Sequence, residues 1–237
     1  MAAAPKIKLY TSHLCPWAHR AHIALAELDL PYEEEIIDLS VPRTPEYLAI
    51  NPRGLVPTIS YNGELVTESG IVAQLLADAH PSHLLPPSNA EGGALRRART
   101  SFFVDAYFSK VSSFSTKVVY GAGDVDAEAL APQFVEAVVK ELEPLLQDAA
   151  PFFGGSEKLT QAEVLTGSFI IRLLAFRRAG LLPESFFAPL PEKAPAFWKW
   201  AQAVAAHPSV TRVFPEERII EGTKARAAKL KAEKAKN

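Results

Sequence analysis

The chain has 237 residues, of which 48% are apolar and 22% charged, so it can form one large or two small globular domains with a buried core. A net charge of −2 gives no sign of nucleic-acid binding, and no apolar run approaches the roughly 20 residues that a membrane span needs. The single cysteine excludes an intramolecular disulfide, and residues 1–6 are too short and weakly apolar for a signal peptide. We therefore expect a cytoplasmic protein.

The first two expected elements meet at the only cysteine. Residues 6–10 are typical of a strand, and residues 18–28, rich in Ala, Leu and Ile, favour a helix. Cys15 stands between them, followed by Pro16, which suits the first helical turn. Free N–H groups at a helix start stabilise an anion, so a cysteine there reacts as a thiolate near neutral pH. A lone cysteine is often only a small buried hydrophobe, but the Cys-Pro junction favours the reactive alternative.

The rest of the first 80 residues has the pattern of a small α/β domain. Pro57 cannot donate to a sheet ladder, so it marks a strand edge or a bend. Asn62-Gly63 is a strong hairpin signal. The further elements expected are a strand over residues 32–39, a short helix over 46–50, a hairpin of 58–61 with 64–66, and a helix over 71–78.

Beyond this domain the pattern is helical. Residues 81–90 are rich in Pro and Ser, which predicts a linker to a helical domain over 91–215. Thr160 and Glu163 form a capping box. The tail over 216–237 is basic and helical by propensity, and we expect a solvated or frayed helix. The helices expected are 96–114, 132–149, 162–179 and 195–206, with breaks at 121–126 and 152–155.

Four features occur in an order and spacing that resemble the cytosolic glutathione transferases. They are the Cys15-Pro16-Trp17 turn, the segment over residues 51–57, the Glu68-Ser69 pair and the capping-box helix. The Cys-Pro-aromatic turn resembles the omega class, and residues 15–20 also resemble the longer glutathionyl-hydroquinone reductases. The resemblance implies an N-terminal thioredoxin-like domain of βαβαββα order and an all-helical C-terminal domain. It also implies a cytoplasmic homodimer with a role in detoxification, and neither nucleic acid nor membrane as partner.

The same resemblance implies roles for individual residues. Cys15 is the expected catalytic residue, and Pro57 is expected to be cis. The Val56 backbone would pair with the cysteinyl part of glutathione like an added strand. Ser69 would hold the γ-glutamyl carboxylate and Glu68 the γ-glutamyl ammonium, with plain N-capping as the alternative for this pair.

At other positions the chain departs from the omega-class sequence, or the resemblance indicates a region without assigning a role to each residue. In the omega class, a lysine in the loop before Pro45 binds the glycine carboxylate of glutathione. This chain has Thr44 at that position, so we expect the neighbouring Arg43, or else Arg53, to bind that carboxylate. Trp17 would lie against glutathione or the second substrate, or pack under the first helix. An acceptor pocket between the domains would involve Tyr107, Phe108, Phe169 and Arg172.

Histidines near the cysteine raise the question of a metal. His19 and His22 are three residues apart on one expected helix, which suits a pair of metal ligands. Nothing nearby in the sequence completes such a site with them or with His13, so we expect no metal and surface or capping roles. Tyr10, the rival activating group, is expected in the core.

The predicted function is that of an omega-like glutathione transferase acting as a thiol transferase or reductase. The enzyme would be a reductase of dehydroascorbate or of glutathionyl adducts. Glutathione would be its cosubstrate, and the acceptor would be a small electrophilic or disulfide-containing molecule. Cys15 would form a mixed disulfide with glutathione, which a second glutathione releases. Two alternatives stay open: a conjugating transferase in which Cys15 only orients glutathione, and a non-catalytic binding or scaffold protein.

Overall fold

A computed structural model describes residues 5–121 and 125–236, and its first half is built around one sheet. The described strands form a four-stranded sheet of order β2-β1-β3-β4, parallel between β1 and β2 and antiparallel elsewhere. The elements are β1 (Ile7–Thr11), α1 (Pro16–Glu27), β2 (Glu33–Ile36), α2 (Pro45–Ile50), β3 (Thr58–Tyr61), β4 (Glu64–Thr67) and α3 (Ser69–Ala79).

The hairpin between β3 and β4 forms where the sequence predicts it. Asn62 and Gly63 both have positive φ angles, of 53° and 94°, as a two-residue hairpin turn requires. Tyr61 is paired with Glu64 across the turn. The local signal is sufficient because both turn residues tolerate the left-handed region.

The predicted strand over residues 32–39 is too long, since β2 ends at Ile36. The N–H of Ile37 still donates to the carbonyl of Thr11 at 2.7 Å. Beyond it, the backbone N–H and the hydroxyl of Ser40 both donate to one carboxylate oxygen of Asp38. This local turn competes with the sheet and takes the chain out of it.

The second half is helical. Short 3₁₀ turns at η3 (Glu143–Leu145), η4 (Phe153–Gly155) and η5 (Glu184–Phe186) connect longer elements. These are α4 (Gly93–Ala106), the π-helical η1 (Tyr107–Val111), α5 (Ser112–Tyr120), α6 (Ala127–Ala137), the π-helical η2 (Val138–Leu142), α7 (Gln161–Arg178), α8 (Leu190–Lys193), α9 (Pro195–Ala206), α10 (Pro208–Thr211) and α11 (Glu216–Lys234).

The helix predicted to begin at Pro132 begins five residues earlier, at Ala127. One carboxylate oxygen of Asp126 accepts from the N–H groups of Glu128 and Ala129, so Asp126 caps the helix. Pro132 lies inside α6, where it lacks an N–H for the ladder but does not end the helix. Of the predicted break over 121–126, residues 122–124 lie outside the described residues.

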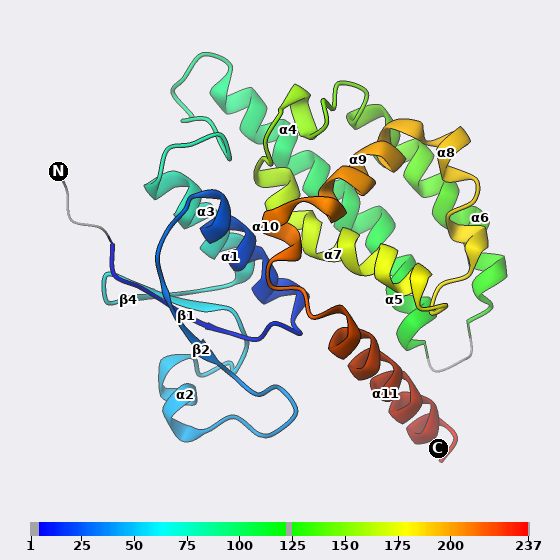
Figure 1. Ribbon diagram of the computed structural model, residues 1–237, viewed down its shortest axis with the longest axis horizontal. Helices are drawn as coiled ribbons and strands as arrows, with labels where there is room; N and C mark the ends of the chain where they lie inside the picture. Colours follow the sequence, from blue (N-terminus) through cyan, green and yellow to red (C-terminus); the bar gives the residue numbers. More distant parts are fainter. Residues whose placement is uncertain (1–4, 122–124, 237) are drawn as a thin grey trace.

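The elements stack in layers around α1. Figure 1 shows α1 and α3 between the sheet and the helical half, with α2 on the other side of the sheet. Helix α1 packs on α7, and Gly167 of α7 is the point of close approach. A Cβ built there would lie 3.2 Å from Val204 Cγ1 and 3.7 Å from Ile23 Cδ1. A larger residue at this position would push the layers apart.

The capping box predicted at Thr160 and Glu163 is confirmed, and it does more than cap α7. Glu163 is completely buried. Its carboxylate accepts from the N–H of Thr160 at 2.7 Å, the N–H of Phe153 at 2.8 Å and the indole N–H of Trp200 at 2.7 Å. One carboxylate thus joins the start of α7 to η4 and α9, in the middle of the helical core.

The predicted fold class, an α/β unit followed by an all-helical one, is confirmed. The basic tail forms α11, as its propensity predicts. Its first turns are held by buried Ile219 and Thr223, whereas most residues after Thr223 are exposed. No helix among residues 5–121 and 125–236 is long and apolar enough to cross a bilayer.

Candidate active site

Cys15 immediately precedes the first turn of α1. Its backbone is extended, with φ −87° and ψ 122°, and Pro16 takes the first helical position. The Cys15 N–H donates to the carbonyl of Ser12 at 3.0 Å, which closes the turn after β1. The half-buried sulfur lies 4.0 Å from the carbonyl oxygen of Val56. The thiol therefore stands at the positive end of a 12-residue helix.

A cavity of about 630 Å³ opens beside this thiol. It is lined by the start of α1, the loops flanking α2, the entry to β3 and the start of α3. Of the predicted binding residues, Arg53 lies outside the lining. Those that line it are Cys15, Trp17, Arg43, Val56, Pro57, Glu68 and Ser69.

The Val56-Pro57 peptide is cis, as the resemblance implies. The preceding carbonyl, that of Leu55, accepts from the Tyr47 hydroxyl at 2.6 Å and the Asn51 amide at 2.9 Å. These bonds fix the segment from one side. No acceptor among the described residues faces the N–H of Val56, and its carbonyl has only the long contact with Cys15. The backbone of Val56 can thus pair with an extended ligand in the cavity.

Glu68 and Ser69 form the start of α3. Glu68 has a φ of 68°, in the left-handed region, and its side chain makes no capping hydrogen bond. Its carboxylate instead forms an exposed ion pair with Arg53. The buried Ser69 hydroxyl accepts from Arg20 Nη1 at 3.1 Å. Plain side-chain capping therefore does not account for this pair.

Arg43 lines the cavity, but much of its guanidinium already holds the loop before α2. Its Nε donates to the carbonyl of Gly54 at 3.0 Å, and its Nη1 donates to the carbonyls of Asp38 and Val41. Gly54 has a φ of 62°, and a Cβ there would meet Arg43 Cγ at 3.1 Å. Within the described part of the chain, Nη2 of Arg43 has no acceptor.

Trp17 and Arg20 line both this cavity and a second one of about 480 Å³. Trp17 is 44% exposed, and its ring lies against Phe169 at 4.7 Å and Phe108 at 5.5 Å between centroids. Of the residues predicted for an acceptor pocket, only Phe108 lines the second cavity. Tyr107 and Arg172 are buried, and the Phe169 ring packs against Trp17.

Arg172 lies under the Cys15 loop. It donates to the carbonyl of Ser168 at 2.8 Å and to that of Leu14 at 3.4 Å, and it contacts His19 Nδ1 at 3.2 Å. Burial lowers the pKa of Arg172 to about 10, which leaves it charged at neutral pH, whereas burial and then Arg172 lower the pKa of His19 well below its usual value. A neutral imidazole and a fixed cation therefore support the loop that carries the thiol.

Comparison with known proteins agrees with this geometry. Residues 14–79 match the family model for the glutathione S-transferase N-terminal domain. The chain is 28% identical over 172 residues to rat glutathione S-transferase omega-1, covering 72% of this chain and 68% of the rat protein. Glutathione transferase Omega 1C of Trametes versicolor superposes with a TM-score of 0.79 at 26% identity, covering 95% and 98% of the chains. A rice glutathione transferase solved in complex with glutathione also gives 0.79, at 27% identity, covering 96% and 99%.

The chain belongs to the glutathione transferase superfamily. The recognition made from the Cys15 turn, the Val56-Pro57 segment and the Glu68-Ser69 pair is confirmed. Omega-class members occur among both its curated relatives and its structural neighbours.

Arg20 is the residue of this transferase's site that sequence reasoning missed. It is buried, donates from Nε to the carbonyl of Leu165 at 2.8 Å and from Nη1 to Ser69, and lies 4.5 Å from the Trp17 ring. Burial lowers its pKa to about 10, so the group stays cationic. Arg20 could have been noticed in the sequence, because it is the one Lys, Arg, Asp or Glu residue among the mainly apolar residues 20–26 of an expected helix.

The expectation of surface or capping roles is wrong for His19 and His22, which are both buried. His19 packs against α7, and His22 is hydrogen-bonded to Thr11 and Tyr32. The sequence pattern hides this because α1 packs on both α3 and α7. A polar residue on such a helix finds its partner in another element.

Replacing Arg20 should test its bridging role. Arg20→Lys is expected to lower the free energy of unfolding by about 1.5–3 kcal/mol, because one ammonium cannot replace the two directed bonds to Leu165 and Ser69. Urea denaturation followed by circular dichroism measures this. Arg53→Lys, which alters only an exposed ion pair, is the control and should cost about 0–1 kcal/mol. Equal losses for the two variants would contradict the bridging role.

Proposed function

We propose that this glutathione transferase acts as a glutathione-dependent thiol transferase or reductase, with Cys15 as its nucleophile. The observation that carries the proposal is the position of the Cys15 sulfur. It stands at the start of α1 and opens into a cavity that also holds the Val56 backbone and the start of α3. A cysteine in this position attacks disulfides, whereas a hydroxyl group would not.

The cavity offers complementary groups for each part of glutathione. The Val56 N–H and carbonyl suit the cysteinyl residue, whose sulfur would then point to Cys15. Ser69 and the N–H groups at the start of the 11-residue α3 suit the γ-glutamyl carboxylate, and Glu68 suits its ammonium. Arg43 Nη2 is our candidate for the glycine carboxylate. Supporting this, the rice relative was solved in complex with glutathione.

The proposed reaction has two thiol–disulfide exchanges. First, the Cys15 thiolate attacks the glutathione sulfur of a mixed disulfide or glutathionyl adduct. A Cys15–glutathione disulfide forms, and the acceptor leaves with the electron pair and takes up a proton. A second glutathione thiolate then attacks the glutathione sulfur of that disulfide, which yields oxidised glutathione and restores the Cys15 thiolate. With no other cysteine in the chain, the second step needs this external thiol.

Fixed positive charge supports the thiolate. The α1 start contributes its dipole, and the buried Arg20 and Arg172 guanidinium groups flank the loop that carries Cys15. Both cations are held by carbonyl oxygens and do not need to move during the reaction. Such preorganised charge favours an anion at low reorganisation cost.

The second cavity, beyond Trp17, is our candidate for the acceptor. Its wall includes Phe108, Val104 and Leu165, with Asp105 and Arg97 at polar positions. A planar or apolar acceptor would lie against the Trp17 ring and face the thiol. We place this chemistry in a reducing compartment, with the cytosol as the simplest choice, since the reaction needs reduced glutathione.

The proposal predicts that Cys15→Ser loses reduction of a glutathione mixed disulfide, such as that with 2-hydroxyethanethiol. A serine hydroxyl cannot form the covalent intermediate, so the rate should fall at least a hundredfold. A coupled glutathione reductase assay measures it, with Ser12→Ala as a control in the same loop. Full activity in Cys15→Ser would contradict the proposal. Gain of conjugating activity in that variant would support a glutathione site that orients a thiolate.

A second prediction concerns Ser69. In a Cys15→Ser background, Ser69→Ala should weaken glutathione binding roughly ten- to a hundredfold, because a hydrogen bond to a charged group contributes about 1.5–3 kcal/mol. Titration calorimetry measures the affinity without thiol exchange. Thr44→Ala is the matched control: it removes the cap of α2 and should lower stability by about 1 kcal/mol with unchanged affinity. Unchanged glutathione affinity in Ser69→Ala would weaken the binding assignment.

We further propose that the protein is a homodimer. Large apolar side chains are exposed on three elements: Leu65 of β4, Ile71 of α3, and Leu95 and Phe102 of α4, the last two 68% and 60% exposed. Helix α3 packs on β4, so two of these elements are neighbours. Large apolar side chains left exposed on neighbouring elements are typical of a contact with another chain.

Sedimentation should therefore give twice the 25.8 kDa chain mass at micromolar concentration. Phe102→Asp should shift the protein towards the monomer, because it places a charge in an apolar contact. Leu48→Asp is the control, since it alters an exposed leucine on α2, across the sheet from α3. A monomeric wild type would contradict the dimer.

A further inference from the structure

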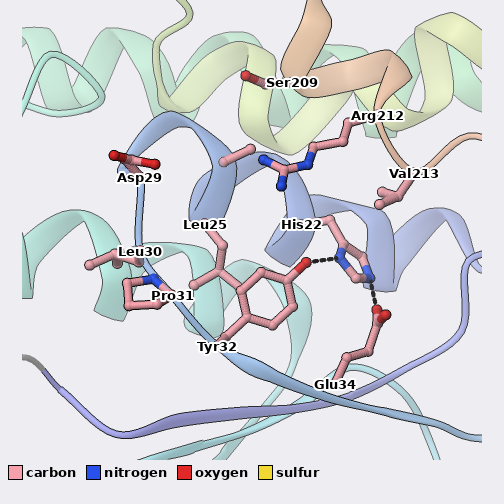
Figure 2. A pocket seen from close by; sticks show the side chains of 11 residues that line it. His22, Leu25, Asp29, Leu30, Pro31, Tyr32, Glu34, Ser209, Arg212 and Val213 are labelled. Carbon is pink, nitrogen blue, oxygen red and sulfur yellow. Dashed lines mark hydrogen bonds and ion pairs between the residues drawn. The ribbon is translucent and has the colours of Figure 1, made fainter.

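A second cluster of polar side chains includes a residue of the loop that carries Cys15. It consists of His13 from the loop between β1 and α1, His22 from α1 and Glu34 from β2. One nitrogen of each imidazole and one carboxylate oxygen all lie within 4.8 Å of one another. Figure 2 shows His22 between Tyr32 and Glu34, on the wall of a cavity.

The spacing of the three ligand atoms is close to that of a metal site. His22 Nε2 lies 3.3 Å from Glu34 Oε1, and His13 Nε2 lies 2.8 Å from the same oxygen. Ligands about 2.0–2.1 Å from a tetrahedral zinc ion are about 3.3 Å apart. His22 already has this separation from the carboxylate. The half-exposed His13 would reach the same separation from this oxygen by moving away from it by about half an ångström.

The hydrogen bonding of His22 suits a ligand. Its imidazole is buried and held in place by contacts with the Tyr32 and Thr11 hydroxyls. Its Nδ1 lies 3.1 Å from the Tyr32 hydroxyl, as the second nitrogen of a metal-bound histidine usually has a fixed partner. With Nδ1–H donated to Tyr32, Nε2 carries the lone pair, which accepts from the Thr11 hydroxyl at 2.9 Å and lies 3.3 Å from Glu34 Oε1. A bound ion would take the place of the Thr11 hydrogen bond.

The cluster is open to solvent on one side. The His13 and Glu34 side chains are 35% and 29% exposed, whereas that of His22 is 1% exposed. Glu34 and His22 also line a cavity of about 470 Å³, whose wall includes Arg212 and Asp29. A metal ion could enter from this side and keep water as a further ligand.

We propose that His13, His22 and Glu34 bind one zinc-type divalent cation, with water completing the coordination. Two imidazoles and one carboxylate form a ligand set that zinc uses with one position left open. The bound ion would tie the loop that carries Cys15 to β2. The inference does not rest on the proposed reaction, because none of its three residues lines the cavity beside Cys15.

Titration with Zn²⁺ alone tests this proposal. Tag-free Cys15→Ser protein is used, so that the thiol cannot bind the ion, and affinity is measured by competition with a chelating indicator. We expect one equivalent to bind and the melting temperature to rise with zinc, because the ion binds the folded state. Tyr32→Phe should weaken binding about tenfold, because it removes the hydroxyl that orients the His22 imidazole through Nδ1.

Two ligand variants and two controls make the test specific. Glu34→Gln and His13→Asn should each weaken zinc binding roughly ten- to a hundredfold. Circular dichroism should show that both variants fold. Glu33→Gln, on the same strand, and His80→Asn, outside the cluster, should bind as the parent does. No zinc binding by the parent, or binding unchanged in both ligand variants, would overturn the proposal and leave a hydrogen-bonded structural triad.

Discussion

The buried Arg20 guanidinium holds the active-site region together. It joins three elements that are far apart in the sequence: α1, which carries it, α7, through the Leu165 carbonyl, and the start of α3, through Ser69. Burying a cation is costly unless its donors are satisfied. Here two directed hydrogen bonds and the faces of Trp17, Phe108 and Phe169 provide that compensation. Arg20 thereby ties Ser69, at the start of α3, to the helix whose start carries Cys15.

Features set by short stretches of sequence were predictable. The hairpin at Asn62-Gly63, the capping box at Thr160 and the cis peptide before Pro57 all formed as expected. The hairpin and the capping box depend on residues within a few positions of one another, so local rules suffice. The cis peptide was expected from the resemblance to the glutathione transferases. The recognition of the family rested on such features and on their order, and it is confirmed.

What the sequence could not show depends on contacts between distant elements. Glu34 reaches the histidines because β2 lies parallel to β1, with Glu34 paired to Leu9, and this brings it beside the loop after β1. Arg20 and Arg172 are charged residues of apolar helices, and only the packing of α1 on α7 reveals their partners. The end of β2 was misjudged because a side-chain turn at Asp38 competes with the ladder.

The chemistry proposed for Cys15 requires a covalent bond between its sulfur and the sulfur of glutathione. Intact mass spectrometry of wild-type protein after exposure to oxidised glutathione tests it most directly. Since Cys15 is the only cysteine, a mixed disulfide can form nowhere else. We expect one glutathionyl group in place of one hydrogen at neutral pH, and dithiothreitol should remove it. A protein that keeps its unmodified mass at neutral pH would contradict it.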